Sequence, residues 1–344
     1  MIDRRQFLSR SGAVAAMAVV PRAFAKGASL THKERVDRAL AGKDVDRPPF
    51  TFYHHYKRTT PEEMAANHLE FHRAYNTHIV KVMNDFSYPR STTGKWWELK
   101  PLDSPYAGQL HVLEEVRKGL NGDAYFIDTL YGPYMTARIL QESEPEFVEM
   151  RKAGTKTEDL VVQRLHAFQQ EQPKEWETAM EVITRSTINH IRLAKQTGAS
   201  GALVSVFNAE SKFGSVADYE RFSRPYDKRI FEALADTKLT VLHLHTLERP
   251  YLGLFRDYGA PVIQHSVKVS GISIAEVREL YPQTIMGGVD EIDFRKLSTE
   301  EIRREWMAAR EEAGSKYIVA PGCSIPDDST QEELARFPRA VVGA

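Results

Sequence analysis

Short apolar segments alternate with amphipathic helical patterns along most of this chain, and this alternation restricts its fold more than any other feature. From about residue 174 the alternation is regular. Strands are predicted at 50–53, 78–83, 124–130, 201–206, 239–244, 261–265, 284–287 and 317–320. Alternation of this kind favours a parallel sheet covered by helices. About eight such units predict a (β/α)8 TIM barrel, a single domain over residues 26–344.

The first 25 residues have the pattern of a processing segment. Arg4-Arg5 is followed by an apolar run over 12–20, and Ala23-Phe24-Ala25 forms an A-x-A cleavage site. These signals stand in the order of a twin-arginine signal peptide, and the apolar run is too short to span a bilayer. We therefore expect export by the Tat pathway, with a mature protein that begins near Lys26 in the periplasm.

Charge and cysteine usage narrow the function classes. The net charge of −1 provides no basic excess for binding phosphates, which argues against nucleic acid or a membrane surface as partner. The sequence also has no G-x-G-x-x-G after its first strand and no Walker motif. Cys323 is the one cysteine, so it is a buried thiol, a catalytic thiol or a metal ligand. A small-molecule substrate is the expected partner.

Polar residues stand where nearly every predicted strand ends. In parallel barrels the chemistry is located at these carboxyl ends. The residues at these points are His54, His55, Asp85, Tyr131, Tyr134, Asn208, Glu210, His243, His245, Gln264, His265, Asp290 and Cys323. So many reactive groups favour an enzyme over an inert scaffold. Because neighbouring side chains in an extended segment point opposite ways, at most one of His54 and His55 should belong to a site.

The segment Thr240–Thr246 carries His243 and His245 two positions apart. Residues i and i+2 of a strand point to the same face, so both imidazoles should project together. Two converging neutral imidazoles provide half of a transition-metal site. The alternative is that both line the barrel, one by packing and one by a hydrogen bond.

Three stretches resemble the uroporphyrinogen decarboxylase superfamily. They are residues 34–49, which end in Arg47-Pro48-Pro49; residues 286–290; and residues 317–326, which contain Pro321-Gly322-Cys323. The resemblance spans nearly the whole mature chain and is weakest across residues 88–170. It implies a (β/α)8 barrel, in agreement with the strand pattern. A homodimer is implied by the same resemblance.

The porphyrinogen decarboxylases of this superfamily imply one set of site residues. In this chain the first of two substrate-binding arginines falls near His54, and Arg58 matches the second. Asp85 matches an aspartate that contacts the substrate, and Tyr134 matches a tyrosine that follows Gly-x-Pro. Cys323 replaces a histidine. A substrate with many carboxylates needs guanidinium groups, so the missing arginine predicts a poor decarboxylase.

The corrinoid-linked methyltransferases imply a zinc site. There, zinc is held by His-x-Cys and by the cysteine of a Pro-Gly-Cys loop, and the metal activates a substrate thiol. The matching ligands are His243, His245 and Cys323, with a histidine at 245 in place of cysteine. A His2Cys set remains competent for Zn²⁺. His265 would be a fourth ligand, a partner of a ligand or a general base.

The leading expectation is thus an exported, zinc-dependent, methyltransferase-like enzyme that acts on a small substrate, with a corrinoid as possible substrate or partner. Asp85, His265 and Glu210 are its candidate acid–base groups, although Glu210 could equally be a loop charge and Asp85 a turn cap. His54, Arg58 and Tyr134 are the candidate substrate contacts. The alternatives are uroporphyrinogen decarboxylation and non-catalytic periplasmic binding of a tetrapyrrole, a corrinoid or a metal.

Overall fold

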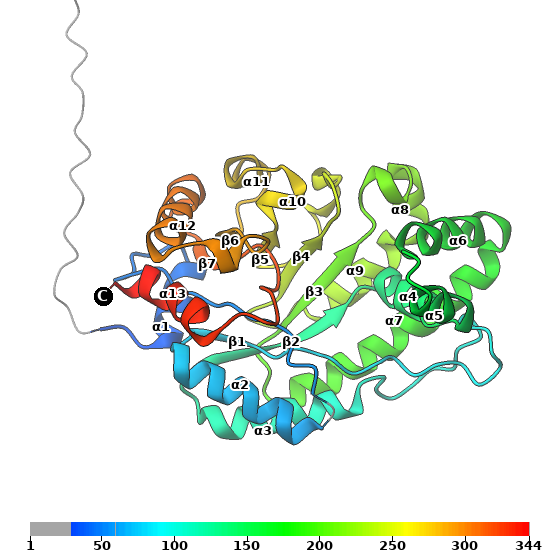
Figure 1. The fold of residues 1–344 in the computed structure, drawn as a ribbon, viewed down its shortest axis with the longest axis horizontal. Coiled ribbons are helices and arrows are strands. Elements are labelled where there is room, and N and C mark those ends of the chain that lie inside the picture. The colour runs from blue at the N-terminus through cyan, green and yellow to red at the C-terminus, as the bar shows by residue number, and fades with distance from the viewer. Residues whose placement is uncertain (1–28, 59, 344) are drawn as a thin grey trace, which may run out of the picture.

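A computed structural model describes residues 29–58 and 60–343 and contains one curled parallel sheet (Figure 1). Its seven strands follow each other in chain order. They are β1 (Ile79–Lys81), β2 (Tyr125–Tyr131), β3 (Ala202–Phe207), β4 (Val241–His245), β5 (Val262–His265), β6 (Thr284–Val289) and β7 (Tyr317–Pro321). The strands are buried because helices cover the sheet, as the apolar runs predicted. The predicted signal segment 1–25 lies outside the described residues.

An extended segment around Phe50 joins the two ends of this sheet. Thr51 N donates to Val319 O of β7 over 3.0 Å, and Val319 N donates to Pro49 O over 2.9 Å. On the other side, His78 N, just before β1, donates to Phe50 O over 2.9 Å. The eighth strand predicted at 50–53 is therefore a short extended bridge, and the described sheet is TIM-barrel-like with seven regular strands.

Helices surround the sheet and connect its strands (Figure 1). Before β3 they are α1 (His32–Leu40), α2 (Pro61–Tyr75), α3 (Ala107–Leu120), α4 (Pro133–Glu142), α5 (Pro145–Lys152), α6 (Glu158–Glu171) and α7 (Pro173–Gln196). After β3 they are α8 (Val216–Phe222), α9 (Arg224–Ala233), α10 (Val267–Ser270), α11 (Ile274–Leu280), α12 (Thr299–Ala313) and α13 (Gln331–Val342). Single 3₁₀ turns are η1 (Ser211–Phe213), η2 (Leu252–Phe255) and η3 (Phe294–Lys296). No helix in the described part of the chain has the length and apolarity needed to cross a membrane.

Two predicted segments differ from the structure. The Pro, Gly and Ser residues that interrupt residues 88–123 predict a long excursion from the scaffold, but α3 lies within this stretch and packs against α2. The sequence pattern from about Ala217 to Leu234 predicts a single helix, but the helix is interrupted at Ser223, where α8 ends and α9 begins. Pro225 explains the break, since it lacks the N–H that would continue the helical hydrogen bonds.

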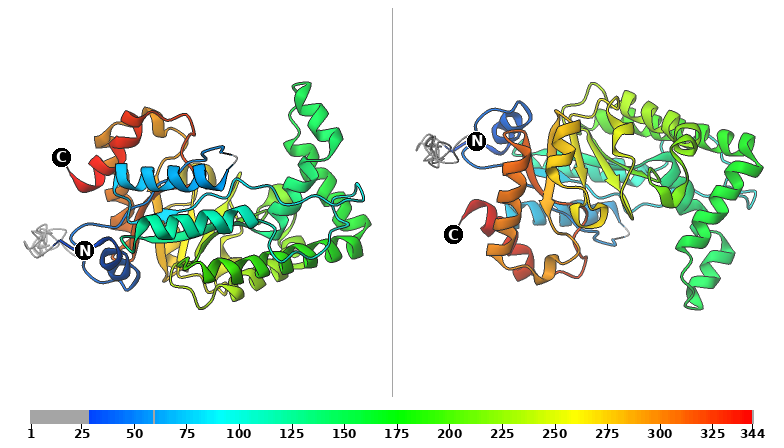
Figure 2. Two further views of the ribbon diagram at one scale, coloured as in Figure 1. Left: turned by 90° about the horizontal axis from the view of Figure 1, so that it is seen from below. Right: turned by 90° about the horizontal axis from the view of Figure 1, so that it is seen from above.

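Helix α4 packs against β2 and β3, and α5 and α6 continue from it as a projection at one side of the molecule (Figure 2). They have their own apolar core, to which Trp96 and Trp176 contribute. Trp96 also donates its indole N–H to Gln141 Oε1 over 2.8 Å. The tryptophans of this region therefore serve packing, and the projection forms a wall beside the carboxyl end of β2.

Candidate metal centre and active-site cavity

His243, His245 and Cys323 converge at the carboxyl ends of the strands. Both histidines lie on β4, where the alternation of side chains places them on the same face. Cys323 follows β7, and its Sγ lies 3.5 Å from His243 Nε2 and 3.7 Å from His245 Nδ1. The three potential ligand atoms lie within 4.8 Å of one another. The structure thus brings together all three predicted ligands, from elements about 80 residues apart in sequence.

These distances fit the size of a zinc site. With Zn–S of about 2.3 Å and Zn–N of about 2.0–2.1 Å, a tetrahedral angle separates nitrogen from sulfur by about 3.6 Å. The observed separations of 3.5 and 3.7 Å lie on either side of that value. If these three side chains held a zinc ion, a fourth position would remain for a bound molecule, as in catalytic zinc sites.

The protonation states of the histidines also suit a metal. Burial is the main cause that lowers the pKa of His245, to about 4, and Arg138 lowers it further. Burial likewise holds the pKa of His243 well below its ordinary value, with His245 as the next cause. Both imidazoles are therefore neutral near pH 7 and have a free lone pair. Burial raises the pKa of the Cys323 thiol, so zinc would have to displace its proton.

The loop that carries Cys323 depends on a close backbone approach. Gly322 N donates to Val289 O over 3.0 Å, which holds the loop against β6. A Cβ at Gly322 would lie 2.5 Å from Ser266 Cα and 2.6 Å from Glu291 Oε2. Glycine is therefore required before Cys323, because any larger residue would push the loop and its thiol away from the histidines.

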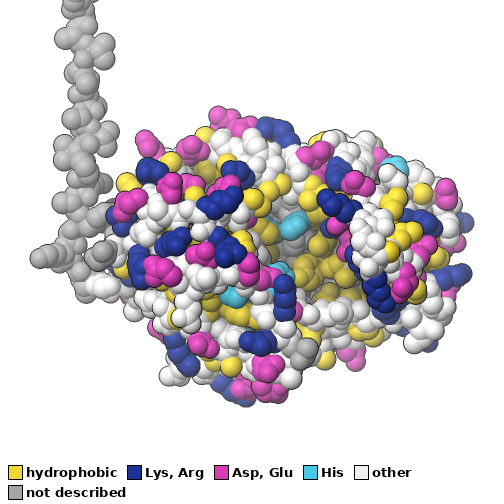
Figure 3. Space-filling view, in the orientation of Figure 1, with side chains coloured by type: hydrophobic (Ala, Val, Ile, Leu, Met, Phe, Trp, Pro, Cys, Tyr) yellow, Lys and Arg dark blue, Asp and Glu magenta, His cyan; other side chains and the backbone are white. Residues whose placement is uncertain are grey.

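Two adjoining cavities open beside this centre. The inner cavity has a volume of about 280 Å³ and contains the three converging side chains on its wall. The outer cavity, of about 450 Å³, is lined in part by Asp85 and Arg58. His55, Tyr131 and Ile139 line both, so the two spaces form one site. Figure 3 shows histidine and apolar side chains inside a hollow whose rim carries charged residues.

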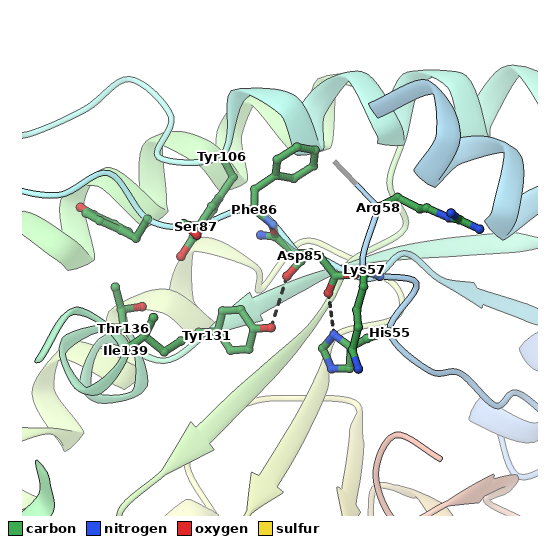
Figure 4. A pocket seen from close by; sticks show the side chains of 12 residues that line it. His55, Lys57, Arg58, Asp85, Phe86, Ser87, Tyr106, Tyr131, Thr136 and Ile139 are labelled. Carbon is green, nitrogen blue, oxygen red and sulfur yellow. Dashed lines mark hydrogen bonds and ion pairs between the residues drawn. The ribbon is translucent and has the colours of Figure 1, made fainter. Parts of the chain in front are cut away.

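His55 and Asp85 form a hydrogen-bonded pair at the junction of the two cavities (Figure 4). His55 Nδ1 lies 2.5 Å from Asp85 Oδ1, and Lys57 N donates to Asp85 Oδ2 over 3.2 Å. Burial raises the pKa of Asp85, but the hydrogen bonds from His55 and the backbone outweigh it, so the pKa is lowered. An ionised Asp85 thus orients the His55 ring and leaves Nε2 for a bound molecule.

Lys81 is a buried charge in the inner cavity that the sequence analysis missed. Its side chain is on β1, the residue is 5% exposed, and Nζ lies 4.0 Å from the centre of the Tyr53 ring. Met83 Sδ accepts from Nζ over 2.7 Å, and no ion-pair partner for Lys81 is found among the described residues. Burial lowers the pKa of Lys81 to about 7, although Cys323 and Asp85 raise it. A lysine inside the apolar run 79–83 was the available signal.

Replacing Lys81 by methionine should stabilise the metal-free protein. Exchanging a buried charge for an apolar side chain of similar volume should raise the free energy of unfolding by about 1–4 kcal/mol at pH 7. Lys81 has a folded-state pKa of about 7, below its ordinary value. Between a pH of about 7 and the ordinary lysine pKa of 10.5, Lys81 binds more protons in the unfolded wild-type chain than in the folded one. The stability of wild type therefore rises with pH in this range, and the advantage of Lys81→Met shrinks.

Urea unfolding in the presence of a chelator, at pH 7 and 9.5, measures this difference. Lys118→Met, at an exposed lysine paired with Glu115, is the matched control and should change stability by no more than about 0.5 kcal/mol. A Lys81→Met protein that is less stable than wild type at pH 7 would contradict the expectation.

Two predicted acid–base residues lie outside the cavity. His265 is 1% exposed on β5, and its Nε2 contacts Ile272 O over 3.0 Å. Its register partner on β4 is Leu244, whereas Gln264 pairs with His243 and shares the inner face. His265 is therefore neither a ligand nor a cavity base. Glu210 is fully buried, and its carboxylate accepts from Leu247 N and Glu248 N at 3.0 to 3.1 Å. It fixes the turn after His245.

The predicted substrate contacts are corrected in the same way. His54 packs against Tyr56 and Phe71, while its neighbour His55 faces the cavities. Tyr134 is buried beside Trp176 in the core of the projection, so Tyr131 takes its place in the cavity wall. Arg58 is at the mouth, but its side chain points away from the other labelled residues (Figure 4).

The fold and the site define a TIM-barrel-like α/β protein with a cavity at the carboxyl ends of its strands. A profile of the family described as uroporphyrinogen decarboxylase (URO-D) matches residues 98–343, well over half of the chain. The chain belongs to this family.

Individual relatives are more distant. A curated uroporphyrinogen decarboxylase from Syntrophotalea carbinolica is 26% identical over 140 residues, and the match spans 38% of each chain. A solved structure described as a methyltransferase from Methanosarcina mazei has a TM-score of 0.67 and 16% identity. The likeness covers 91% of this chain and 99% of that one. At this identity the second likeness concerns the fold alone.

Proposed function

We propose that this chain is a zinc-dependent enzyme that transfers a methyl or other small alkyl group to or from a small substrate. The observation that carries the proposal is the convergence of His243 Nε2, His245 Nδ1 and Cys323 Sγ on the wall of a closed-ended cavity. The ligand spacing, the neutral imidazoles and the open fourth position support zinc. The description of the Methanosarcina structure as a methyltransferase agrees with this reaction class.

Each part of the cavity has a distinct task in this proposal. Zinc, when bound, would lower the pKa of a substrate thiol or water and so supply a nucleophile near pH 7. His55, held by Asp85, would accept the proton that this nucleophile releases, because it lines both cavities. The Lys81 ammonium would favour a substrate that brings negative charge into the inner cavity. The apolar walls would exclude bulk water from the transfer.

An assay with methylcobalamin and a panel of small thiols tests this function. Methylated thiol should accumulate in step with the loss of the methyl–cobalt absorbance, and chelator treatment should abolish the reaction until zinc is added back. Turnover that continues unchanged in zinc-free protein would overturn the proposed zinc dependence. Binding of a corrinoid without turnover, unaffected by Asp85→Asn, would instead indicate a binding protein.

Uroporphyrinogen decarboxylation is the second candidate, because the curated Syntrophotalea relative carries that name and Asp85 lines the outer cavity. The position of Arg58 at the mouth offers one guanidinium, whereas His54 occupies the other expected position and is packed against Phe71. We therefore expect little turnover of uroporphyrinogen. Turnover at an ordinary enzyme rate by metal-free protein would favour this function over methyl transfer.

Export is part of the proposal and rests on Arg4-Arg5 and the segment that follows. Cell fractionation of a producing bacterium should find the mature protein in the periplasm. Replacing Arg4 and Arg5 together by lysine should leave uncleaved precursor in the cytoplasm. Periplasmic protein at wild-type level in this variant would exclude the twin-arginine route.

A further inference from the structure

A second group of potential metal ligands lies at the opposite end of the strands. His32 begins α1, His72 is near the end of α2, and Asp123 stands in the turn before β2. Asp123 Oδ2 is 3.3 Å from His32 Nδ1 and 3.0 Å from His72 Nε2. One ligand atom from each residue lies within 4.8 Å of the others. This group is separate from the cavity. His72 and Asp123 lie near the amino ends of β1 and β2, whereas Cys323 lies at the carboxyl end of β7.

The two imidazoles meet Asp123 differently: His72 Nε2 makes an ordinary hydrogen bond to Asp123 Oδ2 over 3.0 Å, whereas His32 Nδ1 does not. His32 Nδ1 is buried and has no aligned hydrogen-bond partner among the described residues, although Asp123 is close. The nitrogen therefore points beside the carboxylate and not at it. Ligands of a metal behave in this way, because they aim at a common point. Zn–N and Zn–O lengths of about 2.0–2.2 Å at a tetrahedral angle separate the ligand atoms by about 3.4 Å, near the observed values.

The surroundings hold these side chains in place. His72 Nδ1 lies 3.1 Å from Thr77 Oγ1, the kind of contact that orients a metal-binding imidazole. The Asp123 side chain is 58% exposed, which leaves the outer side open to water and to an arriving ion.

Neighbouring charges are already compensated. Arg35 places its guanidinium on both oxygens of Asp46 at 2.7 Å, so its charge is balanced. His78 lies 5.0 Å from His32 between ring centres, but its two nitrogens contact Arg35 Nη1 and Phe50 N. His78 is therefore not a ligand. Among the residues that the structure describes, the His, Cys, Asp and Glu side chains whose ligand atoms lie together here are those of His32, His72 and Asp123.

We propose that His32, His72 and Asp123 form a second zinc site, which clamps α1 and α2 to the turn before β2. A His2Asp set with an open position suits Zn²⁺ or a similar transition metal better than Ca²⁺ or Mg²⁺, which prefer oxygen ligands. Because the ligands come from three separate segments, the bound ion stabilises the folded chain by mass action. The site does not depend on the proposed function of the cavity.

Zinc stoichiometry tests the proposal. The His243→Ala/Cys323→Ala protein, stripped with a chelator and titrated with Zn²⁺ by calorimetry, should bind one equivalent, and Zn²⁺ should raise its Tm. Adding Asp123→Asn should weaken this binding at least about 100-fold and remove the Tm shift. His111→Gln, on the exposed surface of α3, is the matched histidine control. Added to the His243→Ala/Cys323→Ala background, it should leave the affinity for Zn²⁺ unchanged.

The substitutions at His32, His72 and Asp123 are also made in the otherwise wild-type chain, and circular dichroism and gel filtration check that each variant folds. On that wild-type background, His72→Gln or Asp123→Asn alone should bind one zinc equivalent fewer than wild type. A background protein that binds no zinc would overturn the second site. So would an Asp123→Asn, His32→Gln and His72→Gln protein that retains the binding of the background.

Discussion

Cys323→Ala should abolish the cavity zinc and with it the proposed transfer activity. Cys323 provides the only thiolate of the proposed site, and its Sγ lies within 3.7 Å of both imidazoles. Removing a residue that merely orients a metal ligand costs about 10–100-fold in affinity, so loss of a ligand should cost more than about 100-fold. Elemental analysis after dialysis should find one zinc fewer per chain than in wild type.

The matched variants separate the ligand role from packing. Cys323→Ser keeps the volume of the side chain and should lose the same zinc, since a serine hydroxyl is not ionised at pH 7. His245→Ala should give the same stoichiometry, whereas His111→Ala should keep the wild-type value. If Cys323→Ala retains the full zinc content, the cysteine is not a ligand, and the proposed centre is wrong.

The sequence predicted the strands and the two β4 histidines because their determinants are local. Each strand is an apolar run bounded by turn signals, and the common face of His243 and His245 follows from the period of a single strand. The place of Cys323 came from the resemblance, and the structure confirms that it approaches the histidines.

Errors arose where the position of a side chain depends on the register between segments. His265 and Gln264 are adjacent, and only the pairing of β4 with β5 shows that Gln264 shares the inner face with His243. The choice between His54 and His55 depended in the same way on how an irregular segment crosses the cavity. Alternation showed that one of them should face inward but not which one.

Lys81 and the projection show a third limit, which is tertiary packing. A lysine in an apolar run is ordinarily an exposed residue of an edge strand, whereas here its side chain is buried because it lies on the wall of the inner cavity beside Tyr53. Tyr134 is buried in an apolar cluster that α4 to α6 form together with α7, α8 and β3. Tyr131, at the end of β2, is the tyrosine of this segment that lines the cavity.

Asp85→Asn should reduce the proposed transfer activity by about 10²- to 10⁴-fold while the zinc content stays at the wild-type level. Asp85 contacts His55 Nδ1 at 2.5 Å but is not among the zinc ligands, so its loss should affect proton transfer and not metal binding. An asparagine amide has the same shape, but it cannot balance the charge of a protonated His55 or fix its tautomer as a carboxylate does.

The pH dependence of the activity distinguishes this role from simple support of the fold. Although burial raises it, the hydrogen bonds from His55 and the backbone lower the pKa of Asp85, so the wild-type carboxylate stays ionised down to acidic pH and is protonated only when the pH falls through this lowered pKa. Asparagine does not titrate, so the part of the acidic limb that comes from protonating Asp85 should be absent from the residual activity of Asp85→Asn. Asp327→Asn is the matched control, because Asp327 also binds His55, but through the backbone N–H at 3.0 Å. It should leave the limb in place. The same change of the pH profile in both variants, or loss of zinc from Asp85→Asn, would show that Asp85 only positions the loop. Loss of an acid–base group should change the pH profile of the activity and leave the zinc content unchanged.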